Sequence, residues 1–213
     1  MSNSLNEIYR EIKPQLKIRL NQFRSLYRKG NQQEIFQELC FCLLTPQSKA
    51  KSCWEAVLIL RDSGLVHRGT HCEIAQVLRT KTRFHNQKAL NLVLARDLVY
   101  NELEGDLRKL LNSTSRIEKL REQLVRTFRG MGYKEASHFI RNVGRSFDLA
   151  ILDRHILKNL VKHKIIREIP KSINSMKYAE IENKMKRWSE KIDIPLAELD
   201  LLLWYLETGE IFK

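Results

Sequence analysis

The clearest indication of chemistry comes from two glycines, a lysine and an aspartate near the middle of the chain. Gly130 and Gly132 are separated by one residue, Lys134 follows two residues later, and Asp153 comes nineteen residues after the lysine. Because glycine adopts positive φ values and lets the backbone approach another molecule, this spacing predicts a tight hairpin between two helices. The second helix would present unpaired backbone N–H groups to a phosphate, and Arg129 would add positive charge on the same approach. An ordinary turn between helices, capped by glycines, is the alternative.

Lys134 and Asp153 together predict nucleophilic chemistry by an amine. A lysine in the first turn of a helix opposes the helix macrodipole, which disfavours its ammonium form and suits a residue that acts as a neutral amine. Such an amine can attack C1′ of a sugar and form a Schiff base. The carboxylate can take the lysine proton or stabilise positive charge on the sugar. The alternative is a surface lysine and a helix N-cap aspartate, and both roles of Asp153 can hold at once.

The charge balance indicates a polyanionic partner. The 213 residues include 38 Lys and Arg against 25 Asp and Glu, which gives a net charge of +13. With 43% hydrophobic residues the chain can bury a core, so the excess charge belongs to a globular protein. A basic protein without such a partner is the alternative. We expect a nucleic acid, because the charge coincides with a phosphate-binding hairpin.

The cysteines predict neither a metal site nor a redox site. Cys40, Cys42, Cys53 and Cys72 lack C-x-x-C spacing, and no cysteine follows position 72. We therefore expect small core residues, no metal and no cofactor. The sequence has no apolar run long enough to span a membrane, and its first residues lack a signal-peptide pattern. The expected location is the cytoplasm, with association to the nucleoid in a prokaryote.

The elements that must position these residues all have helical periodicity, so we predict an all-α fold. The chain is expected to form one unit, 1–213, with two helical lobes beside a cleft: 31–130, and 1–30 combined with 131–213. Ser115 to Glu118 has the pattern of a capping box. Helices are predicted at 4–28, 34–44, 49–63, 72–80, 86–100, 106–111, 115–128, 133–143, 153–164, 175–191 and 195–208.

The hairpin pattern resembles a known family. Residues 130–136, Gly-x-Gly-x-Lys-x-Ala, with Asp153 beyond them, are similar to the helix-hairpin-helix DNA glycosylases that carry a lyase lysine. The usual Leu-Pro of that family is replaced here by Phe128 and Arg129. Residues 43–49 resemble the loop in which the family places a glutamine. The chain's length, its basic last residues and its lack of cluster cysteines resemble the archaeal-type 8-oxoguanine DNA glycosylase/AP lyases.

The resemblance implies an activity and a set of roles. A damaged nucleotide would be flipped out of duplex DNA that contains 8-oxoguanine or abasic sites. Lys134 would displace the base and allow β-elimination, and Asp153 would assist. Lys213 would distinguish 8-oxoguanine from guanine, with a free carboxylate that accepts from the base. Other implied contacts are base stacking by Trp204 with Phe84 facing it, which core packing could equally explain, and DNA contacts by Gln47, Arg129, Gly130, Gly132 and His155.

Two other functions compete with this interpretation. An endonuclease III-like enzyme for oxidised pyrimidines would keep the fold and change the base, although the absent C-terminal cysteines argue against it. A non-catalytic helix-hairpin-helix DNA-binding module would need neither Lys134 nor Asp153. For the enzyme we expect a monomer without a membrane partner.

Overall fold

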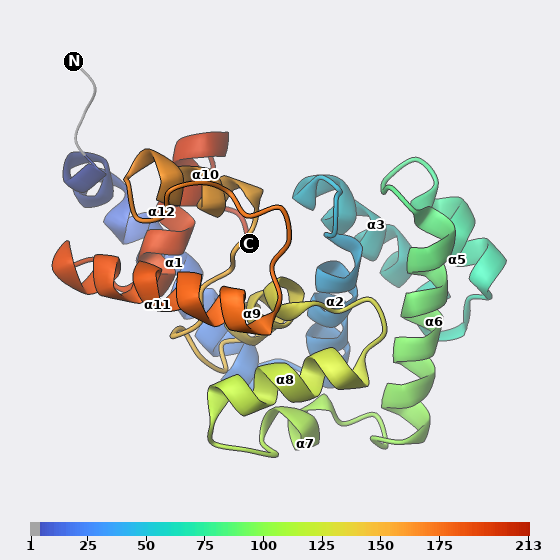
Figure 1. The fold of residues 1–213 in the computed structure, drawn as a ribbon. Coiled ribbons are helices and arrows are strands. Elements are labelled where there is room, and N and C mark those ends of the chain that lie inside the picture. Colours follow the sequence, from blue (N-terminus) through green and yellow to red (C-terminus); the bar gives the residue numbers. More distant parts are fainter. Residues whose placement is uncertain (1–4) are drawn as a thin grey trace.

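The computed structural model describes residues 5–213, and the fold is built from helices. Residues 1–4, where the predicted first helix and the predicted N-terminal part of a lobe begin, lie outside the described residues. No strand occurs within residues 5–213, so the all-α prediction is confirmed. Figure 1 shows the helices along the chain, which are α1 (Leu5–Lys29), α2 (Gln32–Leu44), α3 (Ala50–Asp62), α4 (Leu65–Arg68), α5 (His71–Leu78), α6 (His85–Asn101), α7 (Leu107–Leu111), α8 (Ile117–Thr127), α9 (Tyr133–Asn142), α10 (Arg154–Lys162), α11 (Ser175–Lys191) and α12 (Leu196–Thr208).

Three local features differ from the sequence-based expectation. α4 was not predicted, because its four residues are too few to show periodicity. The expected capping box at the start of α8 is wrong, since Arg116 is the N-cap and has no side-chain cap hydrogen bond. Cys72 is exposed in the first turn of α5, although the other three cysteines are buried as expected.

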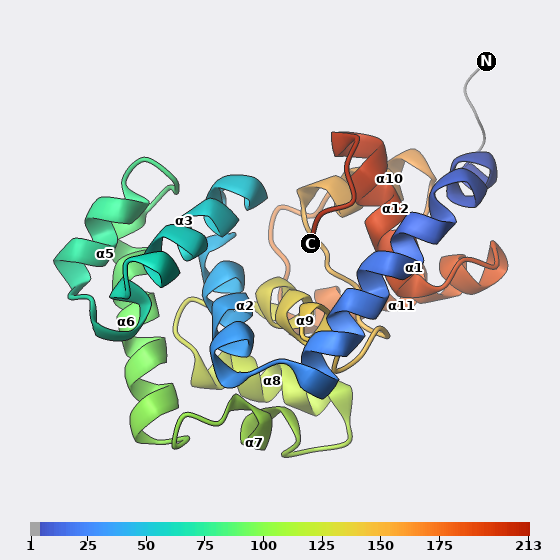
Figure 2. The ribbon, with the colours of Figure 1, turned by 180° about the vertical axis from the view of Figure 1, so that it is seen from behind.

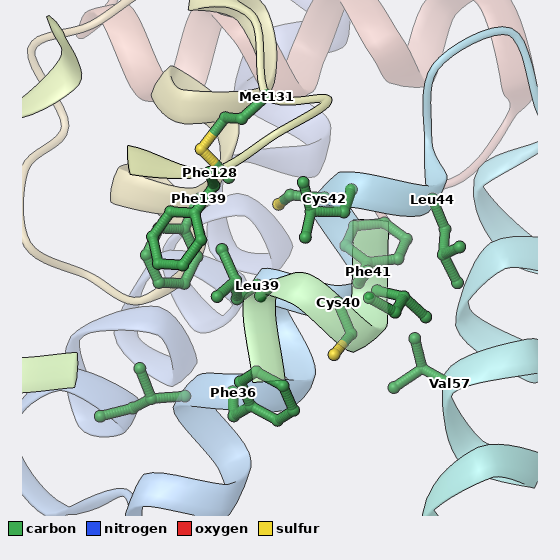
Figure 3. Close-up of a cluster of buried hydrophobic side chains, with 14 of the residues drawn as sticks. Phe36, Leu39, Cys40, Phe41, Cys42, Leu44, Val57, Phe128, Met131 and Phe139 are labelled. Atoms are coloured by element: carbon green, nitrogen blue, oxygen red, sulfur yellow. The ribbon is translucent and has the colours of Figure 1, made fainter. Parts of the chain in front are cut away.

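The buried apolar side chains form two clusters. The first cluster extends from Ile35 to Leu149 and is built mainly around α2. Figure 3 shows how Phe36, Leu39 and Phe139 gather at that helix. The second cluster joins α1 to α10, α11 and α12, and Figure 2 shows α1 running beside α12.

The division between the clusters falls between Leu149 and Ala150 rather than near residue 130. The reason is that α9 contributes Ala136, Phe139 and Ile140 to the first cluster. The predicted division into two lobes, 31–130 and 1–30 combined with 131–213, stays a prediction.

Two buried ion pairs connect the helices of the two clusters. Arg121 on α8 contacts both carboxylate oxygens of Glu182 on α11, at 2.8 and 3.0 Å. Arg141 on α9 contacts Oδ2 of Asp200 on α12 at 3.1 Å. All four side chains are buried, so each charge depends on its partner.

None of the helices in residues 5–213 combines the length and the apolarity that crossing a membrane would require.

Candidate active site

A cleft of about 1470 Å³ brings together elements that are far apart in the sequence. Its walls come from the loop after α2, the loop before α6, the starts of α9 and α10, α12, and the last residues of the chain. Figures 1 and 2 both place the C-terminal end between the side of α3 and the side of α10 and α12. We call this space the cleft.

The glycine hairpin connects α8 to α9 as predicted. Gly130 has a φ of +85°, and a Cβ atom there would lie 2.1 Å from Nδ2 of Asn91. Gly132 is the N-cap of α9, and its backbone N–H donates to Oε2 of Glu135 at 3.2 Å. Arg129 and Gly130 are exposed, and neither they nor Gly132 line the cleft. Their contact with a DNA backbone therefore stays a prediction.

Lys134 extends from the first turn of α9 into the cleft. Its Nζ donates a hydrogen bond to Oγ1 of Thr45 at 3.0 Å and lies 3.4 Å from Oε1 of Glu135. The sequence analysis named neither partner. A lysine side chain is ordinarily an ammonium, which cannot act as a nucleophile. A reaction at Nζ therefore needs a group that removes a proton.

Asp153 lines the same cleft from the start of α10. It is the N-cap of that helix, and Oδ1 accepts from the backbone N–H of Ile156 at 2.8 Å. Within the described part of the chain, Oδ2 makes no hydrogen bond, so it can accept one from a substrate or from an amine. The structure thus gives Asp153 a capping role and leaves one oxygen for chemistry.

The cleft contains a second carboxylate, that of Asp200. Asp200 is 5% exposed, lines the cleft, and pairs with Arg141. The pKa of Asp200 is raised to about 7, chiefly by burial; Arg141 opposes the rise, and the charge of Asp153 adds to it. No local pattern pointed to this residue, because its partner lies 59 positions away.

The side chain of Lys213 packs against the first cluster and does not extend into solvent. Its Nζ lies 3.2 Å from the centre of the Trp54 ring and contacts Oε1 of Glu38. Burial lowers the pKa of the Lys213 ammonium, and Glu38 opposes that shift. The ammonium is thus engaged inside the protein, and Lys213 also lines the cleft. Its predicted part in base discrimination stays a prediction.

The two aromatic residues predicted to hold the base lie in different surroundings. Trp204 lines the cleft, and the His155 ring meets it edge-on at 5.0 Å. Nδ1 of His155 is also 3.5 Å from Oε2 of Glu207. Phe84 is 56% exposed with a φ of +57° and does not line the cleft, although its neighbour Arg83 does. Stacking by either ring stays a prediction.

Gln47 stands on a loop that a buried ammonium holds in place. Its φ is +52°, a strained value for a residue with a side chain, and the residue is exposed at the cleft. Nζ of Lys88 donates to the carbonyls of Leu44 and Pro46 at 2.7 and 2.8 Å, and to Oγ of Ser48 at 2.8 Å. The predicted insertion of Gln47 into a base stack stays a prediction.

Comparisons with known proteins identify the family. A family model described as 8-oxoguanine DNA glycosylase matches residues 16–194. The chain belongs to this family. An 8-oxoguanine DNA glycosylase/AP lyase from Fusobacterium nucleatum is 43% identical, over 99% of this chain and 97% of that protein. One from Methanocaldococcus jannaschii is 39% identical, over 95% of this chain and 94% of its own length.

Solved structures agree with the family. The M. jannaschii 8-oxoguanine glycosylase/lyase in complex with a 15mer DNA containing 8-oxoguanine has a TM-score of 0.88 and 36% identity, and the match covers 98% of this chain and 97% of that one. The 8-oxoguanine DNA glycosylase of Thermotoga maritima has a TM-score of 0.87 and 35% identity, with 98% and 96% covered. The resemblance seen in the sequence is confirmed, and neither alternative function is favoured by these relatives.

Proposed function

We propose that this chain removes 8-oxoguanine from DNA and cleaves the resulting abasic site, with Lys134 as the nucleophile and Asp153 as its acidic partner. The observation that carries the assignment of roles is that both side chains start from helix N-termini and line one cleft. The reaction itself is the one named for the relatives above.

The first step is displacement of the base. Asp153 takes a proton from the Lys134 ammonium, and the free amine attacks C1′ of the extruded nucleotide. The bond between C1′ and the base breaks, and its electron pair leaves with the base, which takes up a proton. Before the attack Nζ is held by Thr45 and Glu135, and it leaves these contacts to reach the sugar.

The second step is strand cleavage. The nitrogen on C1′ then forms a double bond to this carbon as the bond from C1′ to O4′ breaks and O4′ takes up a proton. The sugar ring is thereby opened, and the resulting protonated imine acidifies the protons on C2′. Loss of one of these protons forms a double bond and breaks the bond from C3′ to oxygen, so the 3′ phosphate leaves. Water then releases Lys134 from the imine.

Two further parts of the proposal concern where and how the enzyme acts. We place it in the cytoplasm, at the nucleoid of a prokaryote, where duplex DNA is the substrate. We propose that it acts as a monomer, since one chain supplies every wall of the cleft.

Borohydride trapping tests the assignment. A duplex containing 8-oxoguanine should give a covalent adduct with the wild-type protein and none with Lys134→Gln, because borohydride reduces the imine only where it forms. Lys158→Gln is the matched control, since this exposed lysine on α10 does not line the cleft and should leave the adduct intact. An adduct that persists in Lys134→Gln would contradict the proposal. Stronger trapping on a thymine-glycol duplex would favour the pyrimidine alternative instead.

A further inference from the structure

His138 is part of the cleft wall, but the proposed reaction gives it no task. The side chain is 6% exposed, and within residues 5–213 neither Nδ1 nor Nε2 has a hydrogen-bond partner. A buried polar group without a partner lowers stability, so such groups are rare in folded proteins. An imidazole that is kept in this state inside a substrate cleft points to a ligand that completes its hydrogen bonds.

The position of His138 relates it directly to the reacting lysine. Both residues lie on α9, and a spacing of four places His138 one turn beyond Lys134 on the same face of the helix. The imidazole packs edge-on against Phe41 at 5.4 Å, which fixes the plane of the ring. The main chain of Lys213 lies beside the ring without completing a hydrogen bond.

The surroundings keep the imidazole uncharged. Burial lowers the pKa of His138 well below its usual range, and the charges of Arg141, Lys134 and Lys213 lower it further, while the main chain of Lys213 opposes the shift. A neutral imidazole has one N–H donor and one acceptor nitrogen. These two nitrogens point away from each other, so only one of them can meet a given base edge, and either can find a partner there because a purine edge carries both donors and acceptors.

We propose that His138 hydrogen-bonds the edge of the extruded purine base and so holds the base while Lys134 attacks C1′. This role rests on the proposed function and adds a base-binding residue to it. Because neither ring nitrogen has a partner within the described residues, the base would pair with one of them without breaking any existing hydrogen bond.

Single-turnover rates on two duplexes separate base binding from general damage. One duplex carries 8-oxoguanine, and the other carries a preformed abasic site, which has no base for His138 to hold. His138→Phe keeps a ring against Phe41 but removes both nitrogens. We expect base excision to fall about tenfold to a hundredfold, and cleavage of the abasic site to fall less than about threefold. His138→Gln restores a donor and an acceptor and should recover part of the excision rate.

His163 provides the matched control. Its ring lies against Trp188 at 5.0 Å, and it does not line the cleft. We expect His163→Phe to keep both rates within about twofold of wild type. Equal excision by His138→Phe and wild type would overturn the proposal, and so would equal losses on the two duplexes, since these indicate a structural residue.

A double variant separates direct contact from action through Lys213. If His138 contacts the base itself, His138→Phe should lower excision further in the Lys213→Ala background, by a smaller factor than in wild type because neighbouring residues are not additive. If His138→Phe has no further effect once Lys213 is replaced, the imidazole acts only through that residue and the proposal is overturned. A wild-type protein that forms no trapped adduct would instead overturn the proposed function itself, so the two failures are distinguishable.

Discussion

At the scale of single residues, Asp153 combines a structural and a chemical role. One carboxylate oxygen caps α10 at 2.8 Å, and the other is left for the substrate. Asparagine caps a helix about as well as aspartate, but its amide cannot take the lysine proton. The two roles can therefore be separated by one substitution.

We predict that Asp153→Asn lowers the single-turnover excision rate by a factor on the order of a hundred or more, while the free energy of unfolding changes by less than about 0.5 kcal/mol. Asp153→Ala should lose activity to the same degree and also about 1 kcal/mol of stability, because the cap disappears. Chemical denaturation and single-turnover kinetics on the same preparations provide the measurements. Equal destabilisation by the two substitutions would show that the carboxylate is mainly a cap.

The residues that sequence could predict are those whose signal is local. Lys134 and Asp153 belong to a short sequence pattern, and both side chains line the cleft. Glu38 gave no such signal, because its contact with Lys213 spans 175 positions and only the fold brings the two together. The same reason hides Asp200 and the buried state of His138.

At the scale of elements, the hairpin depends on Gly130 for two separate reasons. Its φ of +85° is unfavourable for a residue with a side chain, and an added Cβ would lie 2.1 Å from Nδ2 of Asn91. Gly209 has a similar φ of +74° and no atom within 4 Å of such a Cβ. The two positions therefore distinguish backbone strain from a steric clash.

We predict that Gly130→Ala destabilises the protein by about 2 to 3 kcal/mol, and that Gly209→Ala costs only about 1 kcal/mol, since strain alone acts there. DNA binding should weaken in Gly130→Ala, because the hairpin must shift away from Asn91. Urea denaturation and a fluorescence-anisotropy titration with duplex DNA check both statements. Equal costs at the two glycines would mean that Asn91 moves aside freely.

The helices themselves were largely predictable, and the exceptions have local causes. α11 has the predicted bounds, because Asn174 caps it and its apolar spacing is regular. α1 runs unbroken through Pro14, although a proline in the interior of a helix usually breaks or bends it. Its buried face on the second cluster offsets the backbone hydrogen bond that proline cannot make.

At the scale of the whole molecule, two ion pairs hold the helices around the cleft together. Arg121 and Arg141 come from α8 and α9, and their carboxylate partners come from α11 and α12. Because Asp200 belongs to one of these pairs and also lines the cleft, its protonation links the stability of the molecule to pH.

Asp200 has a folded-state pKa of about 7 against an ordinary value of 3.8. Between these values the folded protein binds more protons than the unfolded chain does. Stability from this group is therefore fully present below about pH 4 and is lost as the pH rises through about 7.

Asparagine does not titrate, so we predict that wild type loses unfolding free energy relative to Asp200→Asn between about pH 4 and pH 7, by an amount on the order of a few kcal/mol. Urea denaturation of both proteins at a series of pH values measures this difference. A difference that stays constant with pH would show that Asp200 remains ionised beside Arg141 throughout.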